Sequence, residues 1–282
     1  VLNVAYRFNP SNKIVFRNTV TRDTDKETRV FSGLNGGIDN NITATRLRWV
    51  ERMVFSTGVE GEHSAPKLGN SIFRWQFSYS DSRRDEPDLR ENIRETETNQ
   101  FLPLPQSAGR FYNNLQDKIY EPLAEWGLPF FKGSISGLLK VGFRGTFRDR
   151  QFEARRFRFV PVRTQTLDFS QPDNILLGPS NIRPDGWTLR ENTRSTDTYS
   201  GSMDVYGGFA MVDLTLGPRW RVVGGIRVED ADINVRTIDP LVPGGVPAVA
   251  NLNNRDYLPG VSVIYALTAR QNLRAGYGRT VN

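Results

Sequence analysis

The segment from Tyr257 to Asn282 alternates apolar and polar residues with a period of two on both sides of a short polar break. One parity holds the apolar and aromatic side chains, which before the break are Tyr257, Val261, Val263, Tyr265 and Leu267. After Thr268–Asn272 the pattern resumes with Leu273, Ala275 and Tyr277. Because side chains alternate between the two faces of a strand, this pattern predicts an antiparallel hairpin with one apolar face. Two strands cannot cover such a face by themselves, so the rest of the chain must indicate what covers it.

Composition favours one large β domain. The chain has 282 residues, of which 38% are hydrophobic, which is too apolar for a disordered segment. It has no run of about 18 apolar residues, so no transmembrane helix is predicted. Cysteine is absent, which excludes disulfides and thiolate metal sites. The net charge of +6 weakly favours an anionic lipid, ligand or nucleic acid as a neighbour. No signal-peptide pattern follows Val1.

The same alternation recurs along the chain and predicts ten strands. It is cleanest at Phe73–Tyr79 and Leu139–Phe147. In two of the predicted strands the evidence for a strand is weaker. In the strand near residues 43–62, Glu51 falls on the apolar parity, which indicates a bulge or a different register. In the strand near residues 115–131, Pro122 and Pro129 remove backbone donors.

Short and long connections follow one another in strict order. Short turns are expected near residues 9, 65, 132, 217 and 268, and long loops near 23–40, 81–114, 160–196 and 239–254. All short turns then lie at one end of the sheet and all long loops at the other. This arrangement is typical of outer-membrane barrels, which have brief periplasmic turns and long extracellular loops. The clean strands reach, or nearly reach, the 9 to 11 residues that a tilted strand needs to cross a bilayer.

The two faces of the predicted sheet differ in a way that favours a membrane. Aromatic residues lie near the ends of the apolar segments, as interfacial girdles do: Tyr6, Phe8, Trp75, Phe77, Tyr79, Trp220, Tyr257 and Tyr277. The opposite parity carries cations: Arg7, Arg17, Arg74, Lys140, Arg144, Arg148, Arg227 and Arg274. In a soluble sandwich these cations would face water and a second sheet would cover the apolar face. In a membrane barrel they would line a wet lumen, and lipid would replace the second sheet.

Three segments resemble TonB-dependent outer-membrane receptors. The strongest is the final hairpin, LPGVSVIYALTARQNLRAGYGRTVN (Leu258–Asn282), which is similar to a strand, turn and R-x-x-Y-S-R-T-like strand of that family. Arg279 and Thr280 match this pattern, whereas Gly278 replaces the usual serine. The other two segments are FEARRFRFVP (Phe152–Pro161) and GGIRVEDADINVRTIDP (Gly224–Pro240).

The resemblance implies an all-β, antiparallel up-and-down transmembrane β-barrel, of which residues 1–282 would form about ten of 22 strands. It implies that the plug domain, the TonB-contacting segment and the C-terminal strands are absent from this stretch. The implied partners are outer-membrane lipid, the plug, the TonB-type inner-membrane complex and a large scarce ligand such as a siderophore, vitamin or oligosaccharide. The location would be the outer membrane of a Gram-negative-type bacterium. A complete ten-stranded barrel, either a pore or an enzyme, and a soluble β-sandwich binding module remain alternatives.

The sequence offers few candidates for chemistry, and we predict no catalytic, cofactor-binding or metal-binding residue. The only histidine, His63, is interpreted as a solvated residue at the rim. The carboxylates of Glu229, Asp230 and Asp232 are of the type that binds calcium, but a hydrated rim is the preferred interpretation. The arginines and phenylalanines of residues 144–163 have a composition suited to single-stranded nucleic acid. The strand period instead favours lumen lining and contacts with anionic lipid, so no nucleic-acid partner is predicted.

Overall fold

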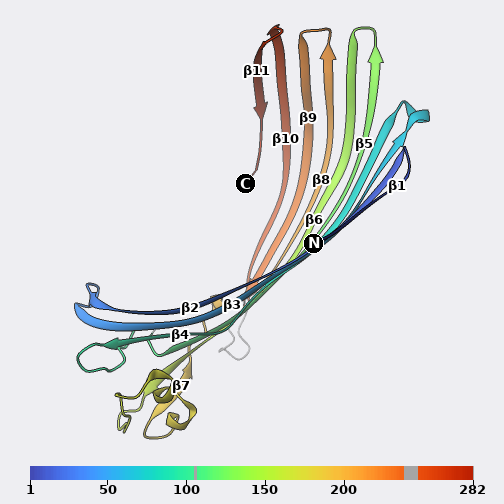
Figure 1. Cartoon of the computed structure of the whole chain (residues 1–282). Helices are drawn as coiled ribbons and strands as arrows, with labels where there is room; N and C mark the ends of the chain where they lie inside the picture. Colours follow the sequence, from blue (N-terminus) through green and yellow to red (C-terminus); the bar gives the residue numbers. More distant parts are fainter. Residues whose placement is uncertain (105–106, 238–246, 282) are drawn as a thin grey trace.

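The computed structural model describes residues 1–104, 107–237 and 247–281, which form one antiparallel sheet (Figure 1). The strands are β1 (Leu2–Asn9), β2 (Asn12–Asn35), β3 (Asn40–Ala65), β4 (Ser71–Glu95), β5 (Gly109–Lys132), β6 (Ile135–Pro161), β7 (Trp187–Glu191), β8 (Thr198–Leu216), β9 (Trp220–Thr237), β10 (Ala248–Thr268) and β11 (Gln271–Gly278). Ten strands are neighbours in chain order, and the short β7 pairs with the end of β6. The up-and-down all-β prediction is therefore confirmed. The sheet is open, since β1 and β11 each pair with one neighbour.

Short and long connections lie at opposite ends of the sheet, which we call the turn end and the loop end (Figure 1). The five predicted short turns are all present, between β1 and β2, β3 and β4, β5 and β6, β8 and β9, and β10 and β11. A 3-10 helix, η1 (Pro66–Leu68), occupies the second of them.

Three of the four predicted loops, near 23–40, 81–114 and 239–254, are too long, because strands continue into them. The loop predicted near 160–196 agrees with the stretch between β6 and β8. β2 and β3 leave only residues 36–39 between them, and β4 and β5 leave residues 96–108. Residues 162–197 contain α1 (Asp173–Leu176), η2 (Pro179–Asn181), β7 and η3 (Ser195–Asp197). Of the last predicted loop, 238–246 lies outside the described residues, and the part from Ala248 onward belongs to β10. No helix in the described residues is long and apolar enough to cross a membrane.

Both strands that were less clearly predicted, near residues 43–62 and 115–131, are present as β3 and β5. β5 is continuous through its two prolines, although its pairing with β6 is interrupted at Glu121 and Pro122. The irregularity suggested at Glu51 comes from an extra residue in the facing strand β4, between Glu86 and Leu89. Pro87 lies there and cannot donate to a neighbouring strand, which is a usual setting for a bulge. Glu51 itself forms an ion pair with Arg22 at 2.9 Å.

The strand register divides the side chains between an apolar face and a polar face. Phe73, opposite Trp126, and Phe143, opposite Ala124, lie on the apolar face, as do Val212 and Val263. Phe73 and Phe143 are 43% and 40% exposed. Within the described residues no second sheet covers them, so this part of the chain does not form a β-sandwich.

Aromatic residues gather at two levels of the apolar face. The level nearer the loop end has Tyr79, Tyr120, Phe147, Tyr206 and Tyr257, several of them in ring contact. The level nearer the turn end has Trp220 and Tyr265, whose ring centroids are 4.5 Å apart. At about 3.3 Å per residue and a tilt of about 40°, the two levels are separated by about 20 to 25 Å. This separation matches the apolar band of a membrane barrel, about 25 Å tall.

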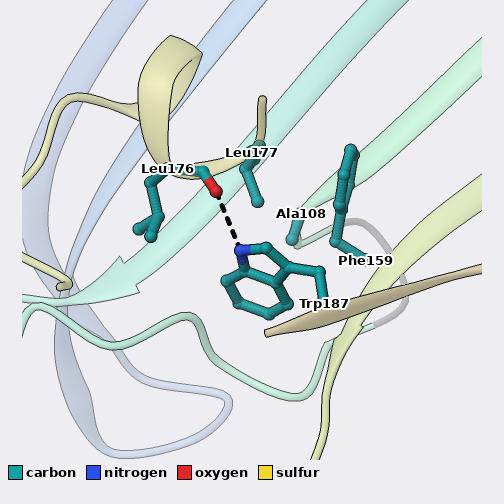
Figure 2. Packing of buried hydrophobic residues seen from close by; sticks show 5 residues of the cluster. All are labelled: Ala108, Phe159, Leu176, Leu177 and Trp187. Carbon is teal, nitrogen blue, oxygen red and sulfur yellow. Dashed lines mark hydrogen bonds between the residues drawn. The ribbon is translucent and has the colours of Figure 1, made fainter. Parts of the chain in front are cut away.

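A small hydrophobic core lies at the loop end of the sheet (Figure 2). Trp187 is its centre, is almost fully buried, and donates its Nε1–H to the carbonyl of Leu176 at 2.9 Å. Ala108, Phe159 and Leu177 complete the cluster. The core therefore joins three segments that are distant in sequence: the start of β5, the end of β6 and the loop that contains α1.

Arg94 links the loop between β4 and β5 to the loop that contains α1, next to this core. Its guanidinium donates to the Asp173 carboxylate and to the carbonyls of Asn99 and Phe169, and it lies over the Phe101 ring at 4.4 Å. Because Arg94 is itself largely buried, these contacts replace the water that the charge has lost.

Candidate functional site

The polar face is the candidate functional surface, and most of its cations are paired. The pairs between adjacent strands include Arg17–Glu60, Arg74–Glu62, Lys140–Glu125, Arg144–Glu121 and Arg221–Asp213, with N–O distances of 2.5 to 3.3 Å. The alternation predicted that the cations share one face, and the register confirms it. The carboxylates that neutralise them come from the facing strands, so the surface is less basic than the arginines alone suggest.

Two buried carboxylates each hold two arginines. Glu86, 2% exposed, accepts hydrogen bonds from Arg48 at 2.8 Å, Arg84 at 2.8 Å and Asn113 at 2.6 Å. Arg48 belongs to β3, Arg84 to β4 and Asn113 to β5, so the carboxylate ties these three strands together. Burial alone would raise the pKa of Glu86, but the donors outweigh it and the pKa lies below its ordinary value.

The second buried carboxylate belongs to Asp117 on β5, which is 4% exposed. It binds both Arg148 and Arg150 of β6, the latter through Nη2 at 2.8 Å. Together, Glu86 and Asp117 hold strands β3 to β6 to one another in the part of the sheet between the aromatic levels and the loop end. Four arginines of the polar face are paired in this way.

A cluster of arginines on β6, on β7 and in the segment after β7 differs from this pattern. We call Arg156, Arg158, Arg190 and Arg194 the arginine cluster. Arg158 lies directly opposite Arg190 across the β6–β7 pair, and neither forms an ion pair within the described chain. Arg156 is the exception: it donates two hydrogen bonds to Asp197, at 2.8 and 3.0 Å.

Two members of the arginine cluster, Arg156 and Arg194, line a polar cavity of about 260 Å³. The cavity is lined by Leu89, Glu91, Phe111, Arg156, Asn192 and Arg194, among others. The guanidinium of Arg156 lies 4.3 Å from the centre of the Phe111 ring, a cation–π contact that holds the side chain in place. The Arg156 side chain therefore forms a fixed part of the cavity wall.

Asp197 is the acidic partner within the arginine cluster. It also accepts the backbone N–H of Arg194 at 2.8 Å, which closes the turn of η3. Burial would raise the pKa of the Asp197 carboxyl, but hydrogen bonds from Arg156 and from the Arg194 backbone outweigh it, so the pKa is lowered. The carboxylate is therefore charged and fully engaged at neutral pH.

His63 lies on the apolar face near the turn end, and both of its ring nitrogens are occupied. Nε2 accepts the Trp75 Nε1–H at 3.0 Å, so Nδ1 carries the proton that Asn12 Oδ1 accepts at 2.7 Å. His63 also stacks against Trp75 and Phe73. These contacts are those of a structural residue, and no carboxylate is hydrogen-bonded to the ring.

The three carboxylates considered for calcium do not meet. Glu229 lies on the polar face and binds Arg227 at 2.5 Å. Asp230 points to the other face and pairs with Arg255, and Asp232 accepts from Asn234 at 2.7 Å. In the parts of the chain that the structure describes, no group of three or more histidine, cysteine or acidic residues is arranged to hold a metal ion.

The arginines of residues 144–163 are also divided between the faces. Arg144, Arg148, Arg150, Arg156 and Arg158 lie on the polar face, whereas Arg155 lies on the apolar side and pairs with Glu191 at 2.7 Å. Phe157 shares the face of Arg155, and Phe152 lies on the polar face. The basic and aromatic side chains therefore do not form one continuous platform.

Sequence reasoning missed the arginine cluster, since Arg190 and Arg194 fall in a segment predicted to be loop. Arg156 and Arg158 did carry a signal, because they continue the parity of Arg144 and Arg148 along one strand. Only the pairing of β7 with β6 brings the other two arginines beside them.

Comparison with known proteins agrees with this architecture. The sequence matches the family profile of the TonB dependent receptor-like β-barrel over residues 2–282. The chain belongs to the TonB-dependent receptor β-barrel family. A search of curated protein sequences gave no significant match.

Several solved receptors and transporters share the fold. The ferric-catecholate import receptor Fiu from E. coli K12, in its closed form, superposes with a TM-score of 0.54 at 13% identity over 98% of this chain and 47% of Fiu. The siderophore receptor PiuA from Acinetobacter baumannii gives 0.55 at 8% identity, over 95% of this chain and 42% of PiuA. The ferric citrate transporter FecA gives 0.52 at 10% identity, over 94% of this chain and 35% of FecA. The chain thus spans between about a third and a half of the structures it matches.

Proposed function

We propose that this chain is part of the barrel of an outer-membrane receptor that imports a large, scarce ligand with energy supplied through a TonB-type complex. The observation that carries the proposal is the contrast between the faces. Aromatic rings such as Tyr257, 53% exposed, lie on one face, while the other pairs its own charges. Lipid is the medium that suits the first face, and a water-filled lumen suits the second.

The long strands fit this position. Beyond the aromatic level of Tyr79 and Tyr120, β4 and β5 continue for most of their remaining length with polar residues on both faces. These extensions, with the core around Trp187, would stand outside the bilayer and carry the arginine cluster toward the medium. The loop end is then extracellular and the turn end periplasmic.

The proposed partners follow from this role. A plug domain of the same polypeptide would fill the lumen, and further strands would pair with the open edges of β1 and β11. The inner-membrane complex would act on the plug. The names of the solved neighbours concern ferric-catecholate, ferric citrate and siderophore transport, so ferric siderophores are the first ligands to test, before vitamins and oligosaccharides.

Energised uptake tests the proposal. Cells carrying the whole polypeptide, and matched cells lacking its gene, are compared for uptake of radiolabelled ferric siderophores, cobalamin and oligosaccharides, each with and without a working TonB. We expect one ligand whose uptake requires both the gene and TonB. Uptake that needs the gene but continues without TonB would instead indicate a passive pore.

A further inference from the structure

The short turns at the turn end of the sheet carry positive charge and no negative charge. Four of the five have a cation in the turn or directly next to it: Lys67, Lys132, Arg219 and Arg270. No aspartate or glutamate lies in any of these turns or within two residues of one. All four cations are exposed, and none forms an ion pair within the described residues. The cations of the polar face, by contrast, mostly have a carboxylate partner, as Arg144 and Arg221 do.

A row of apolar side chains runs across the sheet from one of these cations. Strand pairing sets Lys132 opposite Ile135, and Ile135 opposite Leu216. Trp220 lies opposite both Leu216 and Tyr265, and the centroids of the Trp220 and Tyr265 rings are 4.5 Å apart. All five side chains therefore share the apolar face at one level of the sheet. Trp220 is 47% exposed, and no second sheet covers it within the described residues.

Arg219 joins the charged turns to this apolar row. Its Nη1 donates to the Tyr265 hydroxyl at 3.4 Å, which places the guanidinium beside the Tyr265 ring. Backbone hydrogen bonds hold the turn on both sides. The Gly217 N–H donates to the Ser134 carbonyl at 3.0 Å, and the Arg219 carbonyl accepts the Ala266 N–H at 2.8 Å. The cation is thus held at the border of the apolar face, with most of its five N–H donors open to a ligand.

A cation beside exposed aromatic rings fits the level at which acyl chains meet phospholipid headgroups. Trp and Tyr are enriched there, because one part of each ring is apolar and another part forms hydrogen bonds. Guanidinium groups bind phosphate oxygens in pairs of parallel hydrogen bonds. Each Lys or Arg near an anionic membrane surface strengthens the attraction about fivefold. An acidic protein would fit less well, because the row of Ile135, Leu216 and Trp220 needs an apolar medium beside the cations.

We propose that Arg219, Trp220 and Tyr265, with Lys132 and Arg270 on the neighbouring turns, bind an anionic phospholipid such as phosphatidylglycerol at the turn end of the sheet. The Arg219 guanidinium binds the headgroup phosphate, and the Trp220 and Tyr265 rings lie against the glycerol and the upper part of the acyl chains. This inference rests on the part of the proposed function that puts the apolar face in lipid. It goes beyond it by assigning a class of lipid and the membrane leaflet at the turn end.

Titration with defined lipids tests the assignment. The whole polypeptide, purified in a non-ionic detergent, is titrated with phosphatidylglycerol and separately with phosphatidylcholine of the same acyl chains, and native mass spectrometry counts the lipids bound. We expect the first phosphatidylglycerol to bind at least about fivefold more tightly than phosphatidylcholine, because only its headgroup carries a net charge. Glycerol 3-phosphate, a soluble headgroup without acyl chains, should not displace it at the same concentration.

Single substitutions locate the site. Arg219→Gln should weaken phosphatidylglycerol binding about fivefold and phosphatidylcholine binding less, while Arg219→Lys should keep part of the preference because it keeps the charge. Tyr265→Phe keeps the ring but removes the hydroxyl that holds the guanidinium, so it should weaken phosphatidylglycerol binding by a smaller factor. Arg163→Gln is the matched control, because Arg163 is also exposed and without an ion pair in the described residues but follows β6 at the loop end.

Equal affinities of the wild type for the two lipids would overturn the proposal, and so would displacement of the lipid by glycerol 3-phosphate, which would indicate a site for free phosphate. Equal losses in Arg219→Gln and Arg163→Gln would also overturn it. The result is independent of the transport assay: a protein that prefers phosphatidylglycerol through Arg219 but takes up no ligand through TonB would contradict the proposed uptake and leave this site standing.

Discussion

The indole ring of Trp75 occupies the space beside Gly61 on the neighbouring strand, where a Cβ would lie 2.3 Å from its Nε1. The same Nε1–H binds His63, so the position of the ring depends on the missing side chain. We expect Gly61→Ala to turn the indole away and break this hydrogen bond, at a cost of about 1 to 3 kcal/mol in the free energy of unfolding. Urea titration in detergent measures it.

Gly58 on the same strand provides the matched control, because a Cβ there would meet its neighbours at an ordinary 3.5 Å. Gly58→Ala should leave the unfolding midpoint close to that of the wild type. If the two alanine variants unfold together, Trp75 is not held by the space at Gly61.

The carboxylate of Glu86 holds Arg48 and Arg84 in a nearly buried position. Glu86→Ala leaves both cations without a partner, and breaking a buried pair in this way costs about 3 to 5 kcal/mol. Glu60→Ala removes the partner of the exposed Arg17 and should cost at most about 1 kcal/mol. In chemical unfolding, the midpoint of Glu86→Ala should therefore be clearly lower than that of Glu60→Ala. Similar midpoints would show that Glu86 does not stabilise the sheet through its two arginines.

Asp197 makes the arginine cluster sensitive to acid. Its pKa is lowered in the folded protein, so its contribution to stability is complete above its unfolded pKa, about 4, and is lost as the pH falls through the folded value. We expect Asp197→Asn to flatten the fall in the unfolding midpoint below pH 4. Asp39→Asn, in the exposed β2–β3 turn, controls for loss of a carboxylate; parallel curves for wild type and Asp197→Asn would contradict the prediction.

The contacts of Arg94 predict that one residue controls two loops. Arg94→Ala removes the bonds to Asp173 and to the carbonyls of Asn99 and Phe169, so residues 96–108 and 162–186 should exchange amide hydrogens faster. Hydrogen exchange with mass spectrometry measures both segments. Arg183→Ala, which removes an exposed pair with Asp185, should change exchange only locally. Unchanged protection in Arg94→Ala would mean that the core around Trp187 holds the loops alone.

Local patterns predicted the turns and the faces well, because a period of two and turn residues act over a few positions. They failed where strands leave the proposed bilayer. In β2, the stretch after Asn18 has polar residues on both faces, so it shows no contrast that marks a strand, although Asp23 pairs with Arg52 and Arg22 with Glu51. The site was missed for a different reason. Arg190 meets Arg158 only through pairing across a loop, which no short window of sequence records.

The opposite environments of two adjacent residues give the most direct test of the lipid-facing assignment. Val212 lies on the apolar face, between the aromatic levels marked by Tyr206 and Trp220, and Met211 lies next to it on the polar face. Val212→Arg would place a charge near the centre of the bilayer and should cost about 2 to 4 kcal/mol when the barrel is unfolded from lipid vesicles. Met211→Arg adds the same charge to the wet side and should cost much less. Equal costs would mean that the two faces meet the same medium, which a barrel in a membrane cannot have.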